Sequence, residues 1–329
     1  GVTVVVVGAG VVGLTCAVRL AEAGRRVRVV AREAPLQTTS AVAAALWFPY
    51  RVEPPERVDG WAARSFAVLA RLAGEERESG VVMRELVSLE REDKTDPSWR
   101  DAVEGFRRLR RDELPPGYAG GWRAVVPVVE TPRYMPWLAA RLARAGAAVE
   151  IVPAGLPSLA AAGEGAELVV NCSGLGARAL AGDGTVVPVR GQVVLVENPG
   201  LDRVWLDEDD PARPIYIVPR RDGCVLGGTA EVGAESTEPD PAATAAILSR
   251  AAKLVPALTG ARILGVRVGL RPGRPAVRLE LEPARSASST SAAVPPVIHC
   301  YGHGGAGHTL AWGCADEVLA LAARALSAA

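Results

Sequence analysis

The stretch Gly8-Ala9-Gly10-Val11-Val12-Gly13 follows a continuous β-branched run, Val2–Val7, and precedes a helical apolar pattern that ends at Gly24. A second apolar run, Val27–Ala31, comes next. Such runs are typical of parallel strands buried on both faces, so this region is predicted to form a strand–turn–helix–strand unit. Glycines at this spacing allow a tight turn, let a pyrophosphate approach the backbone and permit close helix–strand packing. We therefore predict a dinucleotide-binding unit at the start of the chain.

The residue that contacts the ribose stays open. An acidic residue normally follows the second strand of such a unit, but the sequence here reads Ala31-Arg32-Glu33. Glu33 is one candidate, displaced by a residue or two, and Arg32 is another, as a partner for phosphate. This motif alone does not distinguish FAD from NAD.

Composition argues against several classes of protein. Among 329 residues, Lys+Arg and Asp+Glu both total 37, whereas a nucleic-acid or acidic-membrane binder needs a basic excess. The apolar stretch Val2–Val18 has no basic segment before it and is interrupted by glycines, so we expect neither a signal peptide nor a membrane helix. Five cysteines without CxxC spacing predict reduced thiols in a cytoplasmic protein.

The three histidines of the chain, His299, His303 and His308, lie in one glycine-rich stretch. Clustered histidines can bind a metal, but here they span a turn, and we expect no carboxylate or cysteine to complete a recognisable ligand set. We therefore predict no metal site. The pattern predicts a strand at Val294–Cys300, a turn, and a helix from about Thr309, whose N-terminus favours negative charge.

These residues carry a resemblance to a known family. His299-x-Tyr301-Gly302-x-Gly304-Gly305-x-Gly307, with Gly313 and Ala315 downstream, resembles the signature of the D-amino-acid oxidases. Cys300 departs modestly from it, since that family usually has Asn, His or Ala there. The resemblance covers essentially the whole chain and implies non-covalently bound FAD. It extends, in order, over Pro35–Ser40, Ala43–Tyr50, Asn171–Gly174, Arg190–Gln192, Tyr216–Pro219, Leu226–Thr229 and Arg271–Pro275.

The implied fold is α/β with two domains. A discontinuous, Rossmann-like FAD-binding domain comprises residues 1–55, 130–182 and 265–329. A mainly antiparallel β-sheet substrate-binding domain comprises residues 56–129 and 183–264. Alternating patterns such as Gln192–Glu197 and the predicted hairpin Tyr216–Thr229 agree with an antiparallel sheet.

The implied activity is oxidative deamination of neutral or apolar D-amino acids. The Cα hydrogen leaves as hydride to flavin N5, driven by the lone pair of a neutral amine, so no acid–base side chain is required. The products are a 2-oxo acid, ammonia and, from oxygen, hydrogen peroxide. The expected partners are the D-amino acid and O2, with no nucleic acid and no membrane, and a homodimer is left open.

By the same resemblance, Arg271 anchors the substrate carboxylate through its planar guanidinium. The alternative is that Arg271 is an ordinary surface arginine, since arginines are frequent in this chain. Tyr216 provides a hydroxyl for the same carboxylate, and its alternative is a core tyrosine with a satisfied hydroxyl. The backbone carbonyl of Gly305 accepts the amine. The side-chain pocket is lined by Leu46, Phe48 and Tyr50.

FAD is expected to contact the glycine loop, the segment after the second strand and the C-terminal turn. The predicted cofactor-binding residues are Gly8, Ala9, Gly10, Val11, Val12, Gly13, Arg32, Thr38, Thr39, Ser40, Ala44, Ala45, Leu46, Ser173, Gly304, Gly305, Gly307, His308 and Thr309.

Several competing functions are weighed. A D-aspartate oxidase needs a cationic pocket, which Arg213 could provide but Leu46 and Phe48 do not suggest. A glycine or sarcosine oxidase shares the fold and much of the mechanism. A dehydrogenase would pass electrons to a quinone or a carrier protein. A non-catalytic flavoprotein would not need to retain Arg271 and Tyr216.

Overall fold

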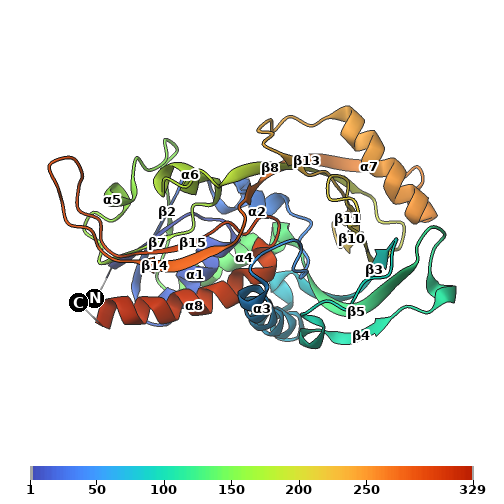
Figure 1. The fold of residues 1–329 in the computed structure, drawn as a ribbon, viewed down its shortest axis with the longest axis horizontal. Coiled ribbons are helices and arrows are strands. Elements are labelled where there is room, and N and C mark those ends of the chain that lie inside the picture. The colour runs from blue at the N-terminus through green and yellow to red at the C-terminus, as the bar shows by residue number, and fades with distance from the viewer. Residues whose placement is uncertain (1–2, 328–329) are drawn as a thin grey trace.

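The computed structural model describes residues 3–327, and the predicted strand start at Val2 lies outside them. Two sheets with flanking helices form the described part of the chain (Figure 1). The first has six strands in the order β14-β15-β7-β1-β2-β6, all parallel except for the antiparallel pair β14–β15. Its strands are β1 (Thr3–Val7), β2 (Arg26–Ala31), β6 (Val149–Ile151), β7 (Leu168–Asn171), β14 (Arg278–Glu282) and β15 (Val297–Tyr301).

Strand β1 is apolar throughout because it lies at the middle of this sheet. Val4 and Val6 are fully buried against the helices α1 (Val11–Glu22) and α8 (Gly307–Ser327). Val5 points to the opposite face, where it joins a smaller cluster with Leu159. Successive strand residues alternate between faces, so a strand covered on both sides must be apolar at every position. The predicted strand–turn–helix–strand unit is confirmed.

The second sheet has nine strands, in the order β12-β8-β11-β10-β9-β3-β5-β4, with β13 paired to β8. It is antiparallel except where β3 runs parallel to β9. The predicted mainly antiparallel sheet is therefore confirmed. Its strands are β3 (Val81–Glu90), β4 (Glu104–Arg108), β5 (Gly120–Val129), β8 (Val187–Val196), β9 (Val204–Asp207), β10 (Ile215–Arg220), β11 (Gly223–Gly227), β12 (Glu231–Val232) and β13 (Ile263–Gly273).

Helix α7 (Pro241–Leu254) covers one face of the nine-stranded sheet, at the upper right of Figure 1. Ile247 and Ala251 of this helix pack on Val194 and Ile217 of the sheet. The opposite face is therefore the one left to line a site. The other α-helices are α2 (Thr39–Val42), α3 (Pro55–Glu75), α4 (Thr131–Arg144), α5 (Leu159–Ala162) and α6 (Ala177–Leu180).

The two predicted domains follow sheet membership closely but not everywhere. Strand β13 belongs to the nine-stranded sheet because it pairs with β8, so the predicted boundary at residue 265 falls within a strand. Helix α3, placed in the substrate-binding domain, packs along α8, where Arg57 forms an ion pair with Glu317 at 2.8 Å. The division into two domains stays a prediction.

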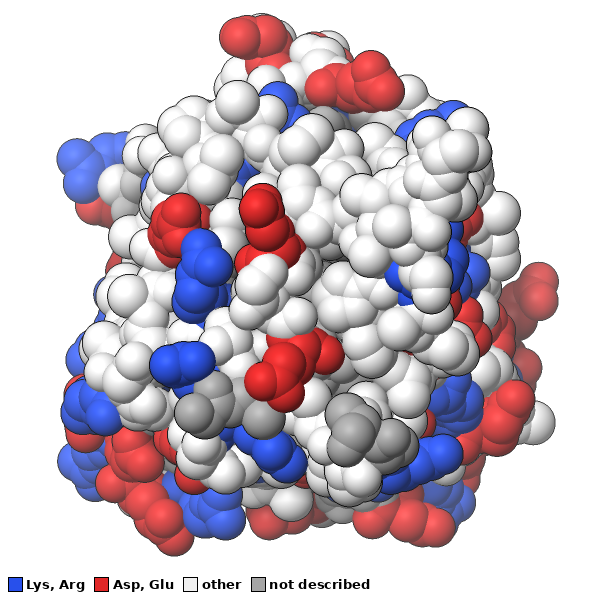
Figure 2. Space-filling model, turned by 90° about the vertical axis from the view of Figure 1, so that its left-hand side faces the viewer, with Lys and Arg blue, Asp and Glu red and all other residues white. Residues whose placement is uncertain are grey.

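The surface carries charges of both signs. In Figure 2, basic and acidic side chains are interspersed over the face shown, and neither sign forms a continuous patch there. Within residues 3–327, no helix combines the length and apolarity needed to cross a membrane. All five cysteines are free thiols buried in the interior.

The crossing of α3 and α8 depends on a glycine. A Cβ on Gly313 would lie 2.2 Å from the carbonyl oxygen of Trp61. We expect Gly313→Ala to lower the free energy of unfolding by about 1–3 kcal/mol, because the two backbones must separate. Gly60→Ala in α3 is the control, since a Cβ there meets nothing within 4 Å and alanine favours a helix by about 0.5–1 kcal/mol. Urea unfolding measures both, and an unchanged midpoint for Gly313→Ala would contradict this packing.

Candidate active site

A cavity of about 1100 Å³ opens at the carboxyl ends of β1, β2, β7 and β15, and one face of the nine-stranded sheet forms its far wall. Ligands of open α/β sheets bind at this edge, outside the carboxyl ends of the strands. The volume exceeds the roughly 300–1000 Å³ of a pocket for one drug-sized ligand. It therefore accommodates a large cofactor together with a second, small ligand.

The glycine loop forms one end of the cavity. A Cβ on Gly13 would lie 2.1 Å from the carbonyl oxygen of Gly8, so helix α1 and the loop are in backbone contact. The hydroxyl of Ser40 accepts a hydrogen bond from the Val11 N–H at 3.0 Å, at the start of α1. Residues Gly8–Gly13 all line the cavity. This close packing leaves bare backbone facing the cavity, which fits a pyrophosphate at a helix N-terminus.

Most of the segment from Thr38 to Leu46 lines the cavity, and hydrogen bonds hold it to distant elements. The Thr39 hydroxyl donates to the Leu270 carbonyl at 3.1 Å. His308 Nε2 lies 2.8 Å from the Ser40 carbonyl oxygen, so this nitrogen carries the proton. Burial lowers the pKa of His308 to about 4, which keeps its ring neutral. Its Nδ1 is buried without a hydrogen-bond partner among the described residues.

The C-terminal turn lies beside the glycine loop. Gly304, Gly305, Gly307 and His308 line the cavity, and helix α8 begins at Gly307, two residues earlier than predicted. Thr309 does not line the cavity. Its hydroxyl accepts from the Phe48 N–H at 3.0 Å and lies 3.1 Å from the Phe48 carbonyl. It holds the chain at Phe48, and the contact of Thr309 with the cofactor stays a prediction.

The two residues considered for the ribose and phosphate contacts are both at the cavity. Both Arg32 and Glu33 line the cavity, as does Ser173 after β7. The loop Val152–Pro157 after β6 also lines it but was missed, because β6 has only three residues and no motif follows it. Its position could have been inferred only from recognising β6 as a parallel strand of this sheet.

The histidines do not form one cluster, but cysteines approach one of them. His299 lies between Asn171 at 3.1 Å and Glu282 at 2.7 Å, which fixes its ring. Ligand atoms of Cys300, His303 and Cys314 lie within 4.8 Å of one another, and so do those of Cys16, Cys172 and Cys300. The expectation that no cysteine completes a set with a histidine is therefore wrong, because the fold brings together residues that lie apart in the sequence. Hydrogen bonds to Cys16 and Cys300, together with burial, raise the pKa of Cys172 well above its ordinary value, so this thiol stays protonated. The absence of a metal stays a prediction.

Strand register brings the two predicted anchors to one face of the sheet. Tyr216 pairs with Gly227, which pairs with Val193. On the neighbouring strand, Arg271 pairs with Val189. Because Val189 and Val193 are four residues apart on β8, their side chains share a face. Tyr216 and Arg271 therefore project from the same face, and both line the cavity.

Both anchors lie flat against glycines. A Cβ on Gly191 would lie 2.4 Å from the Arg271 guanidinium, and a Cβ on Gly227 would lie 2.0 Å from the Tyr216 ring. No other residue type leaves room for these side chains to lie along the sheet. Gly305 is adjacent, since its Cβ position is 3.4 Å from Arg271 Cδ. The three predicted substrate anchors thus gather at one place.

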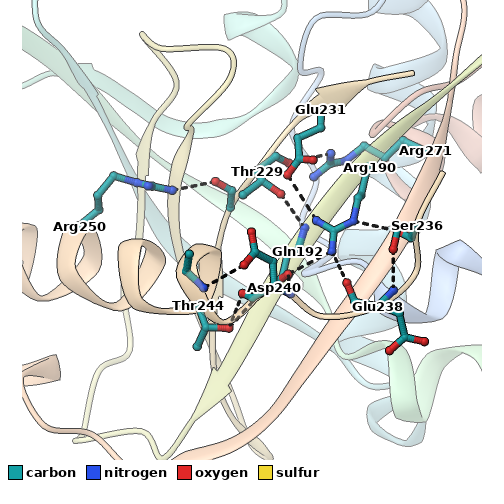
Figure 3. A network of polar contacts seen from close by, with 12 residues as sticks. Arg190, Gln192, Thr229, Glu231, Ser236, Glu238, Asp240, Thr244, Arg250 and Arg271 are labelled. Carbon is teal, nitrogen blue, oxygen red and sulfur yellow. Dashed lines mark hydrogen bonds and ion pairs between the residues drawn. The ribbon is translucent and has the colours of Figure 1, made fainter. Parts of the chain in front are cut away.

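A buried polar network orients Arg271 (Figure 3). The Arg271 guanidinium donates to the Thr229 carbonyl at 3.0 Å, and the Thr229 hydroxyl accepts from the Gln192 N–H at 2.9 Å. Arg190 donates to the Ser236 carbonyl at 2.8 Å and is buried. The segment Arg190–Gln192 therefore supports the site from behind, and its glycine provides the surface on which Arg271 lies.

The side-chain end of the cavity has an apolar wall. Leu46, Phe48 and Tyr50 line it, and Phe48 packs edge-on against Trp99 at 5.6 Å between ring centroids. Arg213 does not line the cavity; it is exposed and pairs with Asp210 at 3.1 Å. Residues at this end that sequence reasoning missed are Arg51, Val52, Leu206, Glu208, Pro211, Ala212, Pro214, Ile215 and Val232.

Known proteins match this arrangement. The model of the family described as FAD dependent oxidoreductase (DAO) matches residues 3–321. A D-amino-acid oxidase of Rubrobacter xylanophilus is 56% identical over 98% of this chain and 96% of its own length. A D-aspartate oxidase of Homo sapiens is 36% identical over 99% of this chain and 96% of its own. A glycine oxidase structure from Geobacillus kaustophilus has a TM-score of 0.79 at 23% identity, covering 98% of this chain and 95% of that one, which shows the fold alone.

Fold and site together define a dinucleotide-binding oxidoreductase. The chain belongs to the FAD dependent oxidoreductase family, and its cofactor is FAD.

Gly13 offers a test of the cofactor cradle. We expect Gly13→Val to lower the FAD content of the purified protein, because the added carbons collide with the Gly8 carbonyl and displace α1 from the loop. Gly74→Val, in α3 with nothing within 4 Å of its Cβ position, is the control. The ratio of flavin to protein absorbance measures both. Full flavin content in Gly13→Val would show that this contact does not shape the cradle.

Proposed function

We propose that this protein is a D-amino-acid oxidase that deaminates neutral or apolar D-amino acids. One observation carries the proposal: Arg271, Tyr216 and Gly305 meet in a cavity that is continuous with the dinucleotide cradle. The 56% identity with a D-amino-acid oxidase supports the same activity.

Each anchor has a separate task. The planar guanidinium of Arg271 binds the α-carboxylate through two parallel N–H groups. The Tyr216 hydroxyl donates to the same carboxylate, and the Gly305 carbonyl accepts an N–H of the amine. Three contacts fix the direction of the Cα–H bond, and such positioning supplies much of the rate when a cofactor carries the chemistry. FAD held by the glycine loop and the C-terminal turn would supply the acceptor for the hydride that leaves Cα.

No side-chain base is needed in this scheme. The lone pair of the neutral amine forms the C=N bond as the Cα hydrogen leaves with its electron pair. With loss of an N–H proton the substrate becomes an imino acid, which water hydrolyses to a 2-oxo acid and ammonia. Oxygen finally accepts two electrons and two protons and becomes hydrogen peroxide.

The alternatives have less support. A D-aspartate oxidase requires a cation at the side-chain end. Arg213 is paired with Asp210 away from the cavity, and Arg51, which does line the cavity, is exposed and donates to the Glu208 carbonyl. A glycine or sarcosine oxidase needs little side-chain room, whereas here an apolar wall of Leu46 and Phe48 extends beyond the anchors.

The five free, buried cysteines support a reducing compartment such as the cytoplasm. Assembly into a homodimer stays a prediction.

The direct test is peroxide release by the purified, FAD-supplemented protein. We expect turnover of D-Ala, D-Val, D-Leu, D-Met and D-Phe, and none of the matching L-forms, glycine or sarcosine. Turnover of D-Asp alone would assign the protein as a D-aspartate oxidase. A flavin-containing protein without activity on any of these compounds would overturn the proposed function.

Arg271 can be tested against a matched arginine. We expect Arg271→Ala to raise the KM for a neutral D-amino acid at least about a hundredfold, because a charged hydrogen-bonded pair is lost, with flavin absorbance retained. Arg267→Ala is the control: it changes an exposed arginine on the same strand that does not line the cavity. Normal KM in Arg271→Ala would remove this residue from the site.

A further inference from the structure

Strand β9 ends at Asp207, the first of four consecutive acidic residues, Asp207–Asp210. Among the described residues, three of these four side chains form ion pairs and one does not. The Asp207 carboxylate accepts from Arg91 and from the Tyr118 hydroxyl at 2.9 and 2.6 Å. Asp209 forms an ion pair with Lys94, and Asp210 one with Arg213. Within residues 3–327, the Glu208 carboxylate forms neither a hydrogen bond nor an ion pair. Its backbone carbonyl alone is engaged, by Arg51 at 3.3 Å.

The alternation of side chains along the strand explains why Glu208 faces the cavity and Asp207 does not. Leu206 pairs with Tyr216 on the cavity face of the sheet, and Asp207 points to the opposite face, toward Arg91 and Tyr118. Glu208 returns to the face of Leu206, as expected two residues along an extended chain. Leu206, Glu208 and Tyr216 accordingly all line the cavity. An unpaired carboxyl is therefore held at the side-chain end of the proposed substrate site.

Glu208 is half-buried at the cavity, so its carboxyl is partly shielded from water. Removing a carboxylate from water without a partner is unfavourable, so buried acids are normally paired. Burial raises the pKa of Glu208 to about 7, whereas Asp209 beside it has a lowered pKa, with the Lys94 hydrogen bond opposing the effect of burial. A perturbed, unpaired acid in a cleft is characteristic of groups whose partner is a ligand.

The basic side chains around Glu208 engage other acceptors, which leaves its carboxylate without an ion pair among residues 3–327. Lys94 and Arg91 are engaged by Asp209 and Asp207. Arg51 also lines the cavity, but its side chain is exposed, donates to the Glu208 carbonyl and lies 5.5 Å from the centre of the Tyr50 ring. The Arg51 and Lys94 charges oppose the effect of burial on the pKa of Glu208, but within residues 3–327 neither side chain forms an ion pair with its carboxylate.

We propose that Glu208 is a specificity-determining residue that binds the cationic end of a basic D-amino acid, such as D-lysine, while Arg271 and Tyr216 hold its α-carboxylate. This inference rests on the proposed D-amino-acid oxidase function and extends its substrate range. The aliphatic part of a lysine side chain suits the apolar wall of Leu46 and Leu206, and its ammonium reaches a polar group beyond that wall, as lysine side chains commonly do. The ion pair offsets the desolvation of Glu208.

The test compares D-lysine with D-norleucine, whose unbranched side chain lacks the ammonium. For the FAD-loaded protein and Glu208→Gln, kcat/KM is measured for both substrates by peroxide release. We expect Glu208→Gln to lower the ratio of D-lysine to D-norleucine about tenfold or more, through the KM for D-lysine, since a charge-assisted contact is lost. The kcat/KM for D-norleucine should be unchanged or rise. Asp210→Asn, which changes an acid of the same run outside the cavity, should leave the ratio unchanged.

The outcomes separate two kinds of failure. If the wild type oxidises D-norleucine and Glu208→Gln leaves the substrate ratio unchanged, the role of Glu208 is overturned while the proposed function stands. If both substrates lose efficiency equally in Glu208→Gln, its role is structural and the inference fails. A wild-type preference for D-glutamate that Arg51→Gln abolishes would assign the side-chain contact to Arg51 instead. No turnover of any D-amino acid would overturn the proposed function and this inference together.

Discussion

The antiparallel pairing of β8 with β13 is the constraint on which the site depends. It runs from Ile263 opposite Val196 to Gly273 opposite Val187, with an irregularity before Gly265, and it fixes Arg271 above Gly191. The same strand holds the two loops that face the cofactor, since Thr39 donates to the Leu270 carbonyl and the Gly304 N–H donates to the Pro272 carbonyl at 3.1 Å. A shift of one residue would turn Arg271 to the other face and displace both loops. Substrate anchor and cofactor cradle are thus positioned by one set of backbone hydrogen bonds.

Arg190, Gln192 and Thr229, behind this ladder, are hydrogen-bonded within the protein, whereas within residues 3–327 the Glu208 carboxylate in front of it is not. The Gln192 N–H donates to the Thr229 hydroxyl, and the side chains of Arg190 and Gln192 donate to the chain near α7 (Figure 3). These hydrogen bonds make the wall of the cavity rigid. On the cavity side, the Glu208 carboxylate lacks a partner among the described residues. An acid that the protein leaves unpaired at the wall of a cavity is a candidate for contact with a ligand.

Sequence reasoning succeeded where the signal is local. The strand, glycine turn and helix at residues 3–22 follow from β-branched residues, glycine spacing and an apolar stripe, which act within a few positions. Arg271 and Tyr216 were identified only through a family pattern, since nothing within their own segments separates them from other arginines and tyrosines. Thr309 is assigned to the cofactor by the same pattern, and the structure adds that its hydroxyl contacts the backbone at Phe48. Such an engagement depends on a segment 261 residues away and has no local signature.

The sequence by itself determined the class of fold, the dinucleotide cradle and the family, because each depends on residue types at fixed, short spacing. Only the tertiary structure decided which side chains share the cavity and which charges are paired. Asp207, Glu208, Asp209 and Asp210 look alike in the sequence, yet the first, third and fourth meet basic side chains and the second does not. The physical reason is that pairing depends on partners such as Arg91 and Lys94, which lie more than a hundred residues away and are brought to the run when β3 pairs with β9.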